Sequence, residues 1–286
     1  MGDKVKSIIV SIMLIFIVAF ISGCSSSVET KSKESIIHDK TFHSKILDGN
    51  LNLKIYIPQV YSSNEKLPVL YFLHGASGNP DTLFDSLDIK NCADRLIANK
   101  RIKPLIIVST DTLNPLRLEE PNKTQSINEN PFEGYICKEL IPFIDSNYNT
   151  ITSKDGRFIG GISMGGFAAI QTAVHHPDIF SKAGGHSPAS WLVEYSDKEI
   201  DNWLYSARQL KKGEDISSLP EETGLADIRI YLDCGKDDSI VNDVEKLFPA
   251  FKKRGIKVEC HVNDGDHAID YWKRNLERYL IFYSGS

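Results

Sequence analysis

One short stretch constrains the fold more than any other part of the sequence. Residues 160–166 read Gly-Gly-Ile-Ser-Met-Gly-Gly; they follow the strand-like residues 157–159 and lead into Met164–His175, which has helical spacing. This pattern predicts a strand, a tight turn at Ser163 and a helix, because the flanking glycines leave room where such a turn packs. The Ser163 hydroxyl would then lie exposed above the strand end, beside the free N–H groups of the helix N-terminus.

Short apolar runs alternate with longer amphipathic segments along the rest of the chain. Strands are expected at Phe42–Leu47, Leu51–Ile57, Pro68–His74, Pro104–Val108, Arg157–Ile162, Phe180–Gly185, Ile228–Cys234 and Lys257–Val262. Helices are expected at Asp81–Lys100, Phe132–Tyr148, Met164–His175, Val241–Lys253 and Ala268–Phe282. The first two strands should form a hairpin through Asp48-Gly49-Asn50. This order predicts one α/β domain with a mostly parallel central sheet and helices on both faces.

Two segments do not fit this alternation. Thr112–Pro131 is rich in Asn, Pro and Glu, and Ser187–Ala226 has no regular pattern. Both are expected to leave the edge of the sheet where ligand-binding loops collect. The second contains Trp191, Tyr195, Trp203 and Tyr205, which suit either contact with a sugar or phenolic group or coverage of the core.

The N-terminus has the features of a bacterial lipoprotein signal. Lys4 and Lys6 precede the apolar run Ile8–Ile21, and small residues then lead directly to Cys24. We therefore expect residues 1–23 to be a signal peptide, Cys24 to carry lipid, residues 24–35 to form a flexible tether, and residues 36–286 to form the domain. An uncleaved membrane anchor is the alternative. The lipid would place the domain at the cell membrane, on the extracytoplasmic face.

Charge and cysteine content exclude several classes of protein. Without residues 1–23 the chain has 31 basic side chains (33 minus Lys4 and Lys6) and 37 acidic ones (38 minus Asp3), a net charge of −6. This balance argues against nucleic acid as a partner. Apart from Cys24, the four cysteines have the spacing of neither a zinc site nor a disulfide scaffold. The remaining length of about 260 residues suits one large domain.

A serine hydroxyl needs a general base, and the base needs an orienting acid, before it can act as a nucleophile near neutral pH. The loops after the last two predicted strands supply both kinds of residue. His267 is favoured over His261 as the base, because His261 lies inside a strand and is expected beside the core. Asp238 is the chosen acid, with its neighbour Asp237 as the competitor.

An oxyanion would need two backbone N–H donors. Met164 follows the candidate nucleophile and is one expected donor. Ala76, in the small-residue turn after Pro68–His74, is the other, with Gly75 as the next candidate and His74 as a brace for the loop. His261, Asp264, Asp266 and His267 also cluster in the sequence, but their spacing matches no zinc or calcium pattern, so no metal site is predicted.

These motifs, taken together, resemble the putative esterase family of α/β-hydrolases. The likeness runs from about residue 38 to 283 and rests on five ordered motifs: His74-Gly75-x-x-Gly78, Gly161-x-Ser163-x-Gly165, His176-Pro177-Asp178-x-Phe180, Gly235-x-x-Asp238 and Gly265-x-His267 with Trp272. Members include feruloyl and acetyl xylan esterases, enterochelin esterases, esterase D-type S-formylglutathione hydrolases and mycolyltransferases. The loop at His74 lacks the Thr-Cys pair associated with the esterase D branch.

The resemblance implies an α/β-hydrolase fold, the catalytic set Ser163, Asp238 and His267, and no metal or organic cofactor. The expected activity is hydrolysis of a small-molecule or oligosaccharide ester, with acylated carbohydrates or phenolic esters as substrates. An ester siderophore hydrolase, an acyltransferase and a non-catalytic surface-tethered binding protein remain alternatives. Neither the acyl group nor the oligomeric state follows from the sequence.

Overall fold

The computed structural model describes residues 34–62, 64–76, 78–111, 131–189 and 225–285. Residues 34–286 form one compact unit. Within the described ranges, no helix has the length and apolar character that crossing a bilayer requires. The expected signal peptide, Cys24, nearly all of the tether and the four aromatic residues between 191 and 205 lie outside these ranges.

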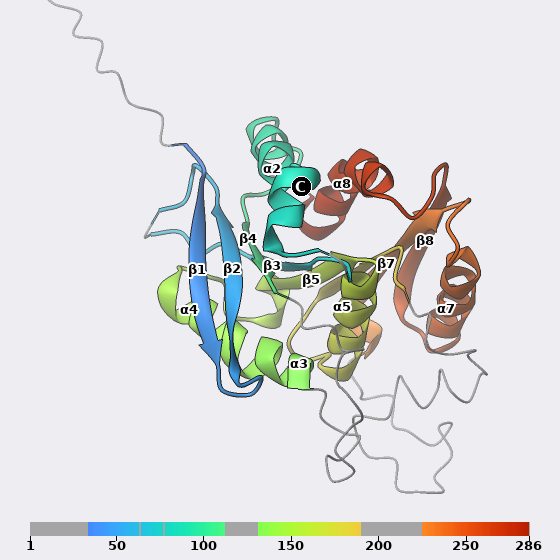
Figure 1. Ribbon diagram of the computed structural model, residues 1–286, viewed down its shortest axis with the longest axis horizontal. Helices are drawn as coiled ribbons and strands as arrows, with labels where there is room; N and C mark the ends of the chain where they lie inside the picture. The colour runs from blue at the N-terminus through green and yellow to red at the C-terminus, as the bar shows by residue number, and fades with distance from the viewer. Residues whose placement is uncertain (1–33, 63, 77, 112–130, 190–224, 286) are drawn as a thin grey trace, which may run out of the picture. The chain divides into compact units, whose positions relative to one another are not determined.

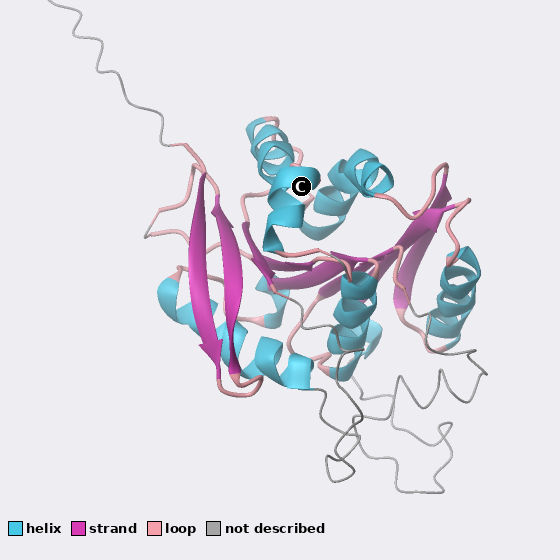
Figure 2. Cartoon of the chain, in the orientation of Figure 1, coloured by secondary structure: helices cyan, strands magenta, loops and turns pink. Residues whose placement is uncertain are grey.

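The centre of the unit is an eight-stranded sheet with the order β1-β2-β4-β3-β5-β6-β7-β8 (Figure 2). The strands are β1 (Ile36–Ser44), β2 (Gly49–Ile57), β3 (Val69–Leu73), β4 (Ile106–Thr110), β5 (Arg157–Ile162), β6 (Lys182–His186), β7 (Arg229–Gly235) and β8 (Lys257–Asn263). Strand β2 pairs antiparallel with both β1 and β4, whereas every other pairing is parallel. The predicted α/β class with a mostly parallel sheet is confirmed.

Helices cover both faces of this sheet (Figure 1). The face that carries η1 and α2 also carries α8, and the opposite face carries the remaining long helices. The helical segments are η1 (Thr82–Ser86), α2 (Ile89–Ala98), α3 (Pro131–Tyr135), η3 (Ile136–Leu140), α4 (Ile141–Asn147), η4 (Lys154–Gly156), α5 (Met164–His175), η7 (Leu225–Asp227), α7 (Val241–Lys253) and α8 (Ile269–Ser284).

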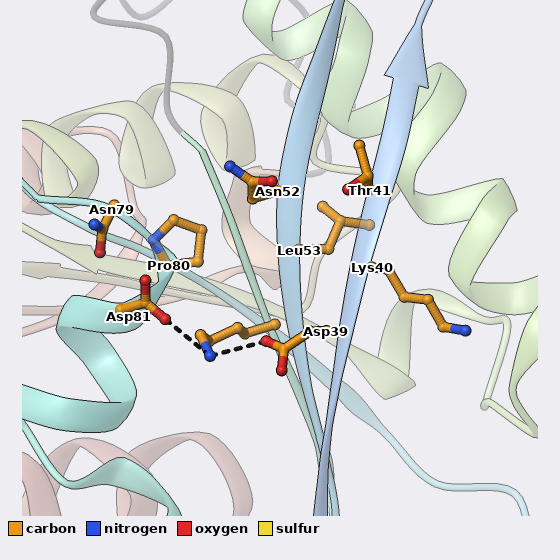
Figure 3. Close-up of a pocket in the computed structure, with 9 residues that line it drawn as sticks. Asp39, Lys40, Thr41, Asn52, Leu53, Asn79, Pro80 and Asp81 are labelled. Atoms are coloured by element: carbon orange, nitrogen blue, oxygen red, sulfur yellow. Dashed lines mark ion pairs between the residues drawn. The ribbon is translucent and has the colours of Figure 1, made fainter.

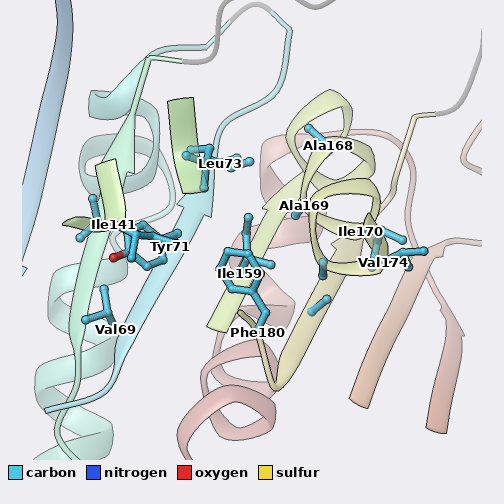
Figure 4. Packing of buried hydrophobic residues seen from close by; sticks show 14 of the residues in the cluster. Val69, Tyr71, Leu73, Ile141, Ile159, Ala168, Ala169, Ile170, Val174 and Phe180 are labelled. Carbon is cyan, nitrogen blue, oxygen red and sulfur yellow. The ribbon is translucent and has the colours of Figure 1, made fainter. Parts of the chain in front are cut away.

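Alternation along each strand divides the core into two clusters. In β3, Val69, Tyr71 and Leu73 belong to the cluster under α4 and α5, and Figure 4 shows their side chains beside residues of these helices. Leu70 and Phe72 belong to the cluster under α2 and α8. All five side chains are fully buried, as expected for a strand covered on both faces.

Several local predictions were wrong, among them strand β4, which begins and ends two residues later than predicted. The hairpin turn occupies residues 45–48 instead of 48–50, and β1 begins at Ile36, six residues earlier than expected. The helix expected at Asp81–Lys100 is broken, because Asp88 adopts a left-handed backbone (φ 60°) between η1 and α2. Strand β6 begins at Lys182 and ends at His186, two residues and one residue later than predicted.

Candidate active site

Ser163 occupies the tight turn between β5 and α5, with φ 53° and ψ −123°. Few residues other than glycine adopt this region, so the surrounding contacts must hold the turn. A Cβ atom on Gly161 would lie 2.5 Å from the backbone of Gly165, and a Cβ on Gly165 would lie 2.4 Å from the carbonyl oxygen of His74. Only glycine fits at both positions, and the close packing lifts Ser163 above the carboxyl end of β5.

His267 lies between Ser163 and Asp238. The Oγ of Ser163 is 2.8 Å from Nε2 of His267, and Nδ1 of the same ring is 2.9 Å from Oδ2 of Asp238. Asp237 points to solvent from the same loop, whereas Asp238 is buried. The loops after β5, β7 and β8 therefore bring together the serine, the acid and the histidine that the sequence indicated.

Several donors keep the Asp238 carboxylate ionised. Burial pushes its pKa upward, but hydrogen bonds from His267, the N–H of Ile240 and the Ser187 hydroxyl outweigh burial, so the pKa lies below the ordinary aspartate value. The N–H of Ile240 donates to Oδ1 at 3.0 Å. The acid is thus both oriented and held in the charged form that stabilises a protonated histidine.

The sequence analysis missed Ser187. This fully buried residue follows β6 with φ 48°, and its hydroxyl donates to Asp238 while accepting a hydrogen bond from Nε1 of Trp272 at 3.1 Å. The ring of Trp272 meets the His267 ring edge to face, with centroids 5.1 Å apart. No recognised motif marks a serine that acts through an acid, so only its position directly after a glycine-rich strand could have drawn attention to it.

A cavity of about 540 Å³ opens directly onto Ser163 and His267. Gly75, Ala76 and Gly78 line one part of it; a Cβ atom on Gly75 would be 3.3 Å from the Cβ of Ser163. The remaining lining residues are the hydroxyl-bearing Thr82 and Ser86 and the apolar Ile162, Ala268, Ile269 and Trp272. Both polar and apolar side chains thus line the cavity beside the serine.

The two expected oxyanion donors flank this serine. Met164 is the first residue of α5, and N–H groups at this position have no partner within a helix. Ala76 lines the cavity, and the loop that carries it is braced as expected, because Nδ1 of the buried His74 is 2.8 Å from the carbonyl oxygen of Gly75. The fully buried Ile162 and the strand end beneath it support the same wall.

The four residues considered as a metal cluster do not converge. The ring of His261 stacks on Tyr231 with centroids 4.9 Å apart, and Asp264 forms an ion pair with Lys236. Among the described residues, no three His, Cys, Asp or Glu side chains gather as a metal site needs. The expectation that His261 lies beside the core was wrong: β8 is the edge strand, and the His261 side chain is 43% exposed.

A second buried histidine–aspartate pair supports the site from below. Nδ1 of His186 is 2.7 Å from Oδ1 of Asp233, and Oδ2 of Asp233 accepts hydrogen bonds from Tyr271 and Tyr279 of α8. The carbonyl of His186 accepts the N–H of Ser163 at 2.8 Å. This network ties the ends of β6 and β7 to α8, which begins just after His267.

Comparison with known proteins places this arrangement in a family. The family model described as putative esterase matches residues 44–283. The chain belongs to this family. It is an esterase, that is, a carboxylic ester hydrolase.

Relatives extend the likeness over most of the chain. An acetyl esterase of Caldicellulosiruptor saccharolyticus is 25% identical over 82% of this chain and 93% of that protein. An endo-1,4-beta-xylanase/feruloyl esterase of Xylanibacter ruminicola is 27% identical over 85% of this chain, but the match covers only 30% of that longer protein. A solved ferulic acid esterase structure, 24% identical, superposes with a TM-score of 0.73 over 88% of this chain and 98% of its own. The α/β-hydrolase fold is confirmed.

Proposed function

We propose that this protein is a serine carboxylic ester hydrolase that works through a covalent acyl-enzyme, with Ser163 as nucleophile, His267 as base and Asp238 as orienting acid. The observation that carries the proposal is the unbroken hydrogen-bond chain from Ser163 through His267 to the buried Asp238, at the wall of an open cavity. No metal or cofactor takes part in this chemistry.

The geometry supports the following sequence of steps. As the Ser163 Oγ attacks the ester carbonyl carbon, Nε2 of His267 takes its proton, and the carbonyl oxygen becomes an oxyanion held by the N–H groups of Met164 and Ala76. The protonated His267, stabilised by Asp238, then gives its proton to the departing alcohol. Water, deprotonated by His267, attacks the acyl-enzyme and releases the carboxylic acid and Ser163.

Acylated carbohydrates and phenolic esters are the proposed substrates. The cavity is lined by the hydroxyl-bearing Thr82 and Ser86 and by the apolar Ile269 and Trp272, which suits an ester that joins an apolar acyl group to a hydroxylated alcohol. The names of the acetyl esterase and feruloyl esterase relatives support the same class. We further propose that lipid on Cys24 anchors the mature protein at the extracytoplasmic face of the cell membrane.

A panel of esters tests the activity. We expect turnover of 4-nitrophenyl acetate, 4-nitrophenyl butyrate, methyl ferulate or acetylated oligosaccharides, with no gain when metal is added and no loss when chelator is present. A catecholate siderophore ester tests the iron-scavenging alternative, and product analysis with an added alcohol acceptor distinguishes hydrolysis from acyl transfer. Failure of the wild-type protein to cleave any of these esters would contradict the proposal.

Two variants test the assignment of the acid. Asp238→Asn should lower kcat by about 10⁴-fold, because the amide favours the wrong tautomer of His267. Asp237→Asn is the matched control: its side chain is exposed on the same loop, and its kcat should stay within about twofold of wild type. Similar effects at both positions, or the reverse order, would show that Asp238 is not the acid.

A further inference from the structure

A second cavity lies between the β1–β2 hairpin and residues 79–81, which follow the small-residue turn at Gly75 and Ala76. Its volume is about 330 Å³, and Figure 3 shows the side chains that line it. The hairpin contributes Asp39, Lys40, Thr41, Asn52, Leu53 and Lys54, and the loop contributes Asn79, Pro80 and Asp81. None of these residues belongs to the hydrogen-bonded chain around Ser163.

Strand register explains why the floor of this cavity is polar. Asp39 lies opposite Lys54, and Thr41 lies opposite Asn52, so all four side chains point to the same face of the hairpin. Two residues back along β1, the pair Ile37 and Tyr56 packs on that face against the cluster under α2 and α8. The hairpin therefore extends past the apolar layer, and its outer part presents hydrogen-bonding groups instead of core residues.

Three of the four charged side chains that line the cavity are paired with one another. Nζ of Lys54 lies 2.8 Å from Oδ1 of Asp39 and 2.8 Å from Oδ1 of Asp81 (Figure 3). The ammonium occupies the position between two carboxylates that a divalent cation would need. Because these three groups together carry a net charge of −1, and the Lys40 side chain points away from them (Figure 3), the group does not favour an anionic ligand either. A neutral ligand is the remaining class.

The other polar groups suit a ligand rich in hydroxyls. Within the described part of the chain, the Thr41 hydroxyl and the Asn52 side-chain amide have no hydrogen-bond partner, and both side chains are exposed. The Asn52 side-chain amide offers both donors and an acceptor, which matches the paired donor and acceptor character of neighbouring hydroxyl groups on a ligand. The ring of the buried Pro80 forms an apolar side of the cavity, as Figure 3 shows.

The position of this cavity connects it to the site at Ser163. Asn52 and Leu53 lie at the carboxyl end of β4, where Leu53 pairs with Thr110, so the cavity opens at the sheet edge that carries Ser163. Three strand spacings separate β2 from β5 in the sheet, a distance of about 14 Å. One continuous loop lines both cavities, because Asp81 of the second directly precedes Thr82 of the first.

We propose that the cavity between the β1–β2 hairpin and residues 79–81 is a carbohydrate subsite that holds the sugar chain of an acylated oligosaccharide while its ester lies at Ser163. The proposal rests on the proposed esterase function and adds to it the place where the alcohol part of the substrate binds. Thr41 and Asn52 supply the main hydrogen bonds, with the side chains of Asn79 and Asp81 on the facing wall.

The double variant Thr41→Ala/Asn52→Ala tests the subsite. Both side chains are exposed on a hairpin, so the fold should persist. For an acetylated xylo-oligosaccharide we expect KM to rise at least fivefold with kcat nearly unchanged, and for 4-nitrophenyl acetate we expect both constants to stay within twofold. The control is His43→Ala/Asn50→Ala, the next cross-strand pair on the same face, which lies outside the cavity lining and should match wild type on both substrates.

Calorimetry with the unesterified xylo-oligosaccharide and the Ser163→Ala protein gives an independent measurement. The Ser163→Ala protein should bind the oligosaccharide, and the triple variant Ser163→Ala/Thr41→Ala/Asn52→Ala should bind it with a Kd at least fivefold higher. An unchanged KM in the double variant together with unchanged binding in the triple variant, or no binding by the Ser163→Ala protein, would overturn the subsite even if 4-nitrophenyl acetate is cleaved. Absence of turnover on every ester would instead overturn the proposed function, and oligosaccharide binding would then be judged by calorimetry alone.

Discussion

At the scale of single residues, the candidate site depends on how each polar side chain is held. Ser163 is 5% exposed, and its N–H and carbonyl groups are bonded to His186, Phe167 and Ala189. The backbone is therefore fixed on both sides of a conformation that costs of the order of 1–3 kcal/mol. The hydroxyl is directed at Nε2 of His267, at the wall of the cavity.

Ser187 gives a prediction that separates positioning from folding. Ser187→Ala removes a hydroxyl that donates to Asp238, so kcat should fall about tenfold while KM for 4-nitrophenyl acetate changes little, because Ser187 does not line the cavity. The exposed Ser239→Ala is the control and should resemble wild type.

The same variant should alter the dependence of stability on pH. The pKa of Asp238 is lower in the folded protein than the unfolded value of about 3.9, so its contribution to stability is complete above that value and is lost as pH falls through the lowered pKa. Without the hydroxyl the pKa moves back toward the unfolded value, so the loss of stability with falling pH should be smaller and should end at a higher pH. Urea unfolding between pH 6 and pH 3 measures the difference; superimposable profiles would argue against a hydrogen bond to Asp238.

The residues at the site differ in how far sequence could predict them. Ser163 and His267 follow from glycine-flanked turns at strand ends, where the type of neighbour limits the options. Asp237 and Asp238 share one turn, and only the direction in which each side chain points distinguishes them. Ser187 acts through a contact with another loop, which no local pattern encodes.

At the scale of elements, the turn between β5 and α5 depends on small residues. Gly165→Ala should abolish activity and destabilise the protein by about 3 kcal/mol, because its Cβ would overlap the backbone of His74 and Leu73. Gly134→Ala is the matched control. Gly134 lies in helix α3, and a Cβ there would meet the Ile46 side chain at an ordinary contact distance of 3.6 Å, so the free energy of unfolding should rise by about 0.5–1 kcal/mol. Thermal and urea unfolding compare the two, and a tolerated Gly165→Ala would contradict the packing described.

The C-terminal end of α8 is tied to β6 through the half-buried Lys182. Nζ of Lys182 donates to the carbonyls of Phe282 and Tyr283. Burial, followed by repulsion from Arg229 and Lys103, lowers its pKa to about 8 from the ordinary 10.5.

This lowered pKa predicts a specific pH dependence. Between pH 8 and 10.5 the unfolded chain binds more protons at Lys182 than the folded protein does, so stability rises with pH over that window. Lys182→Met lacks the titrating group. The free energy of unfolding of wild type minus that of Lys182→Met should therefore increase from pH 8 to 10.5, and a flat or falling difference would mean that the lysine is not buried as described.

Element boundaries show where local patterns lose their value. The apolar spacing of Asp81–Lys100 is helical throughout, yet Asp88 breaks it, since packing against the sheet sets the direction of α2 independently of η1. In the hairpin, the strong turn residues Gly49 and Asn50 became the first residues of β2, because pairing with Ser44 and His43 of β1 outweighs turn preference.

At the scale of the whole molecule, alternation of strands and helices was enough to predict the fold class. Parallel strands must return through helices, and this requirement covers both faces of the sheet. The spatial order of the strands, including the position of β8 at the edge, depends on long-range pairing that local patterns do not encode. The wrong expectation that His261 lies beside the core came from not knowing that β8 is an edge strand. Residues 112–130 and 190–224, which the sequence analysis associated with ligand loops, lie outside the described ranges.

Anchoring is a property of the whole molecule that can be tested apart from catalysis. Cys24→Ala should release the protein from membranes without lowering turnover of soluble esters, because the expected flexible tether, residues 24–35, separates the anchor from the domain. Cell fractionation and mass spectrometry of the native N-terminus measure this. An intact N-terminal Met1 without lipid would refute the lipoprotein proposal while leaving the esterase proposal standing.

The central claim is that Ser163 forms a covalent intermediate, and labelling with a fluorophosphonate tests it most directly. We predict that intact-mass spectrometry of the wild-type protein shows one adduct, that peptide mapping places it on Ser163, and that ester turnover is lost in proportion. The Ser163→Ala protein should take up no probe and should lose several orders of magnitude in kcat. An adduct on another residue, or a Ser163→Ala protein that keeps more than about a tenth of wild-type turnover, would contradict the account.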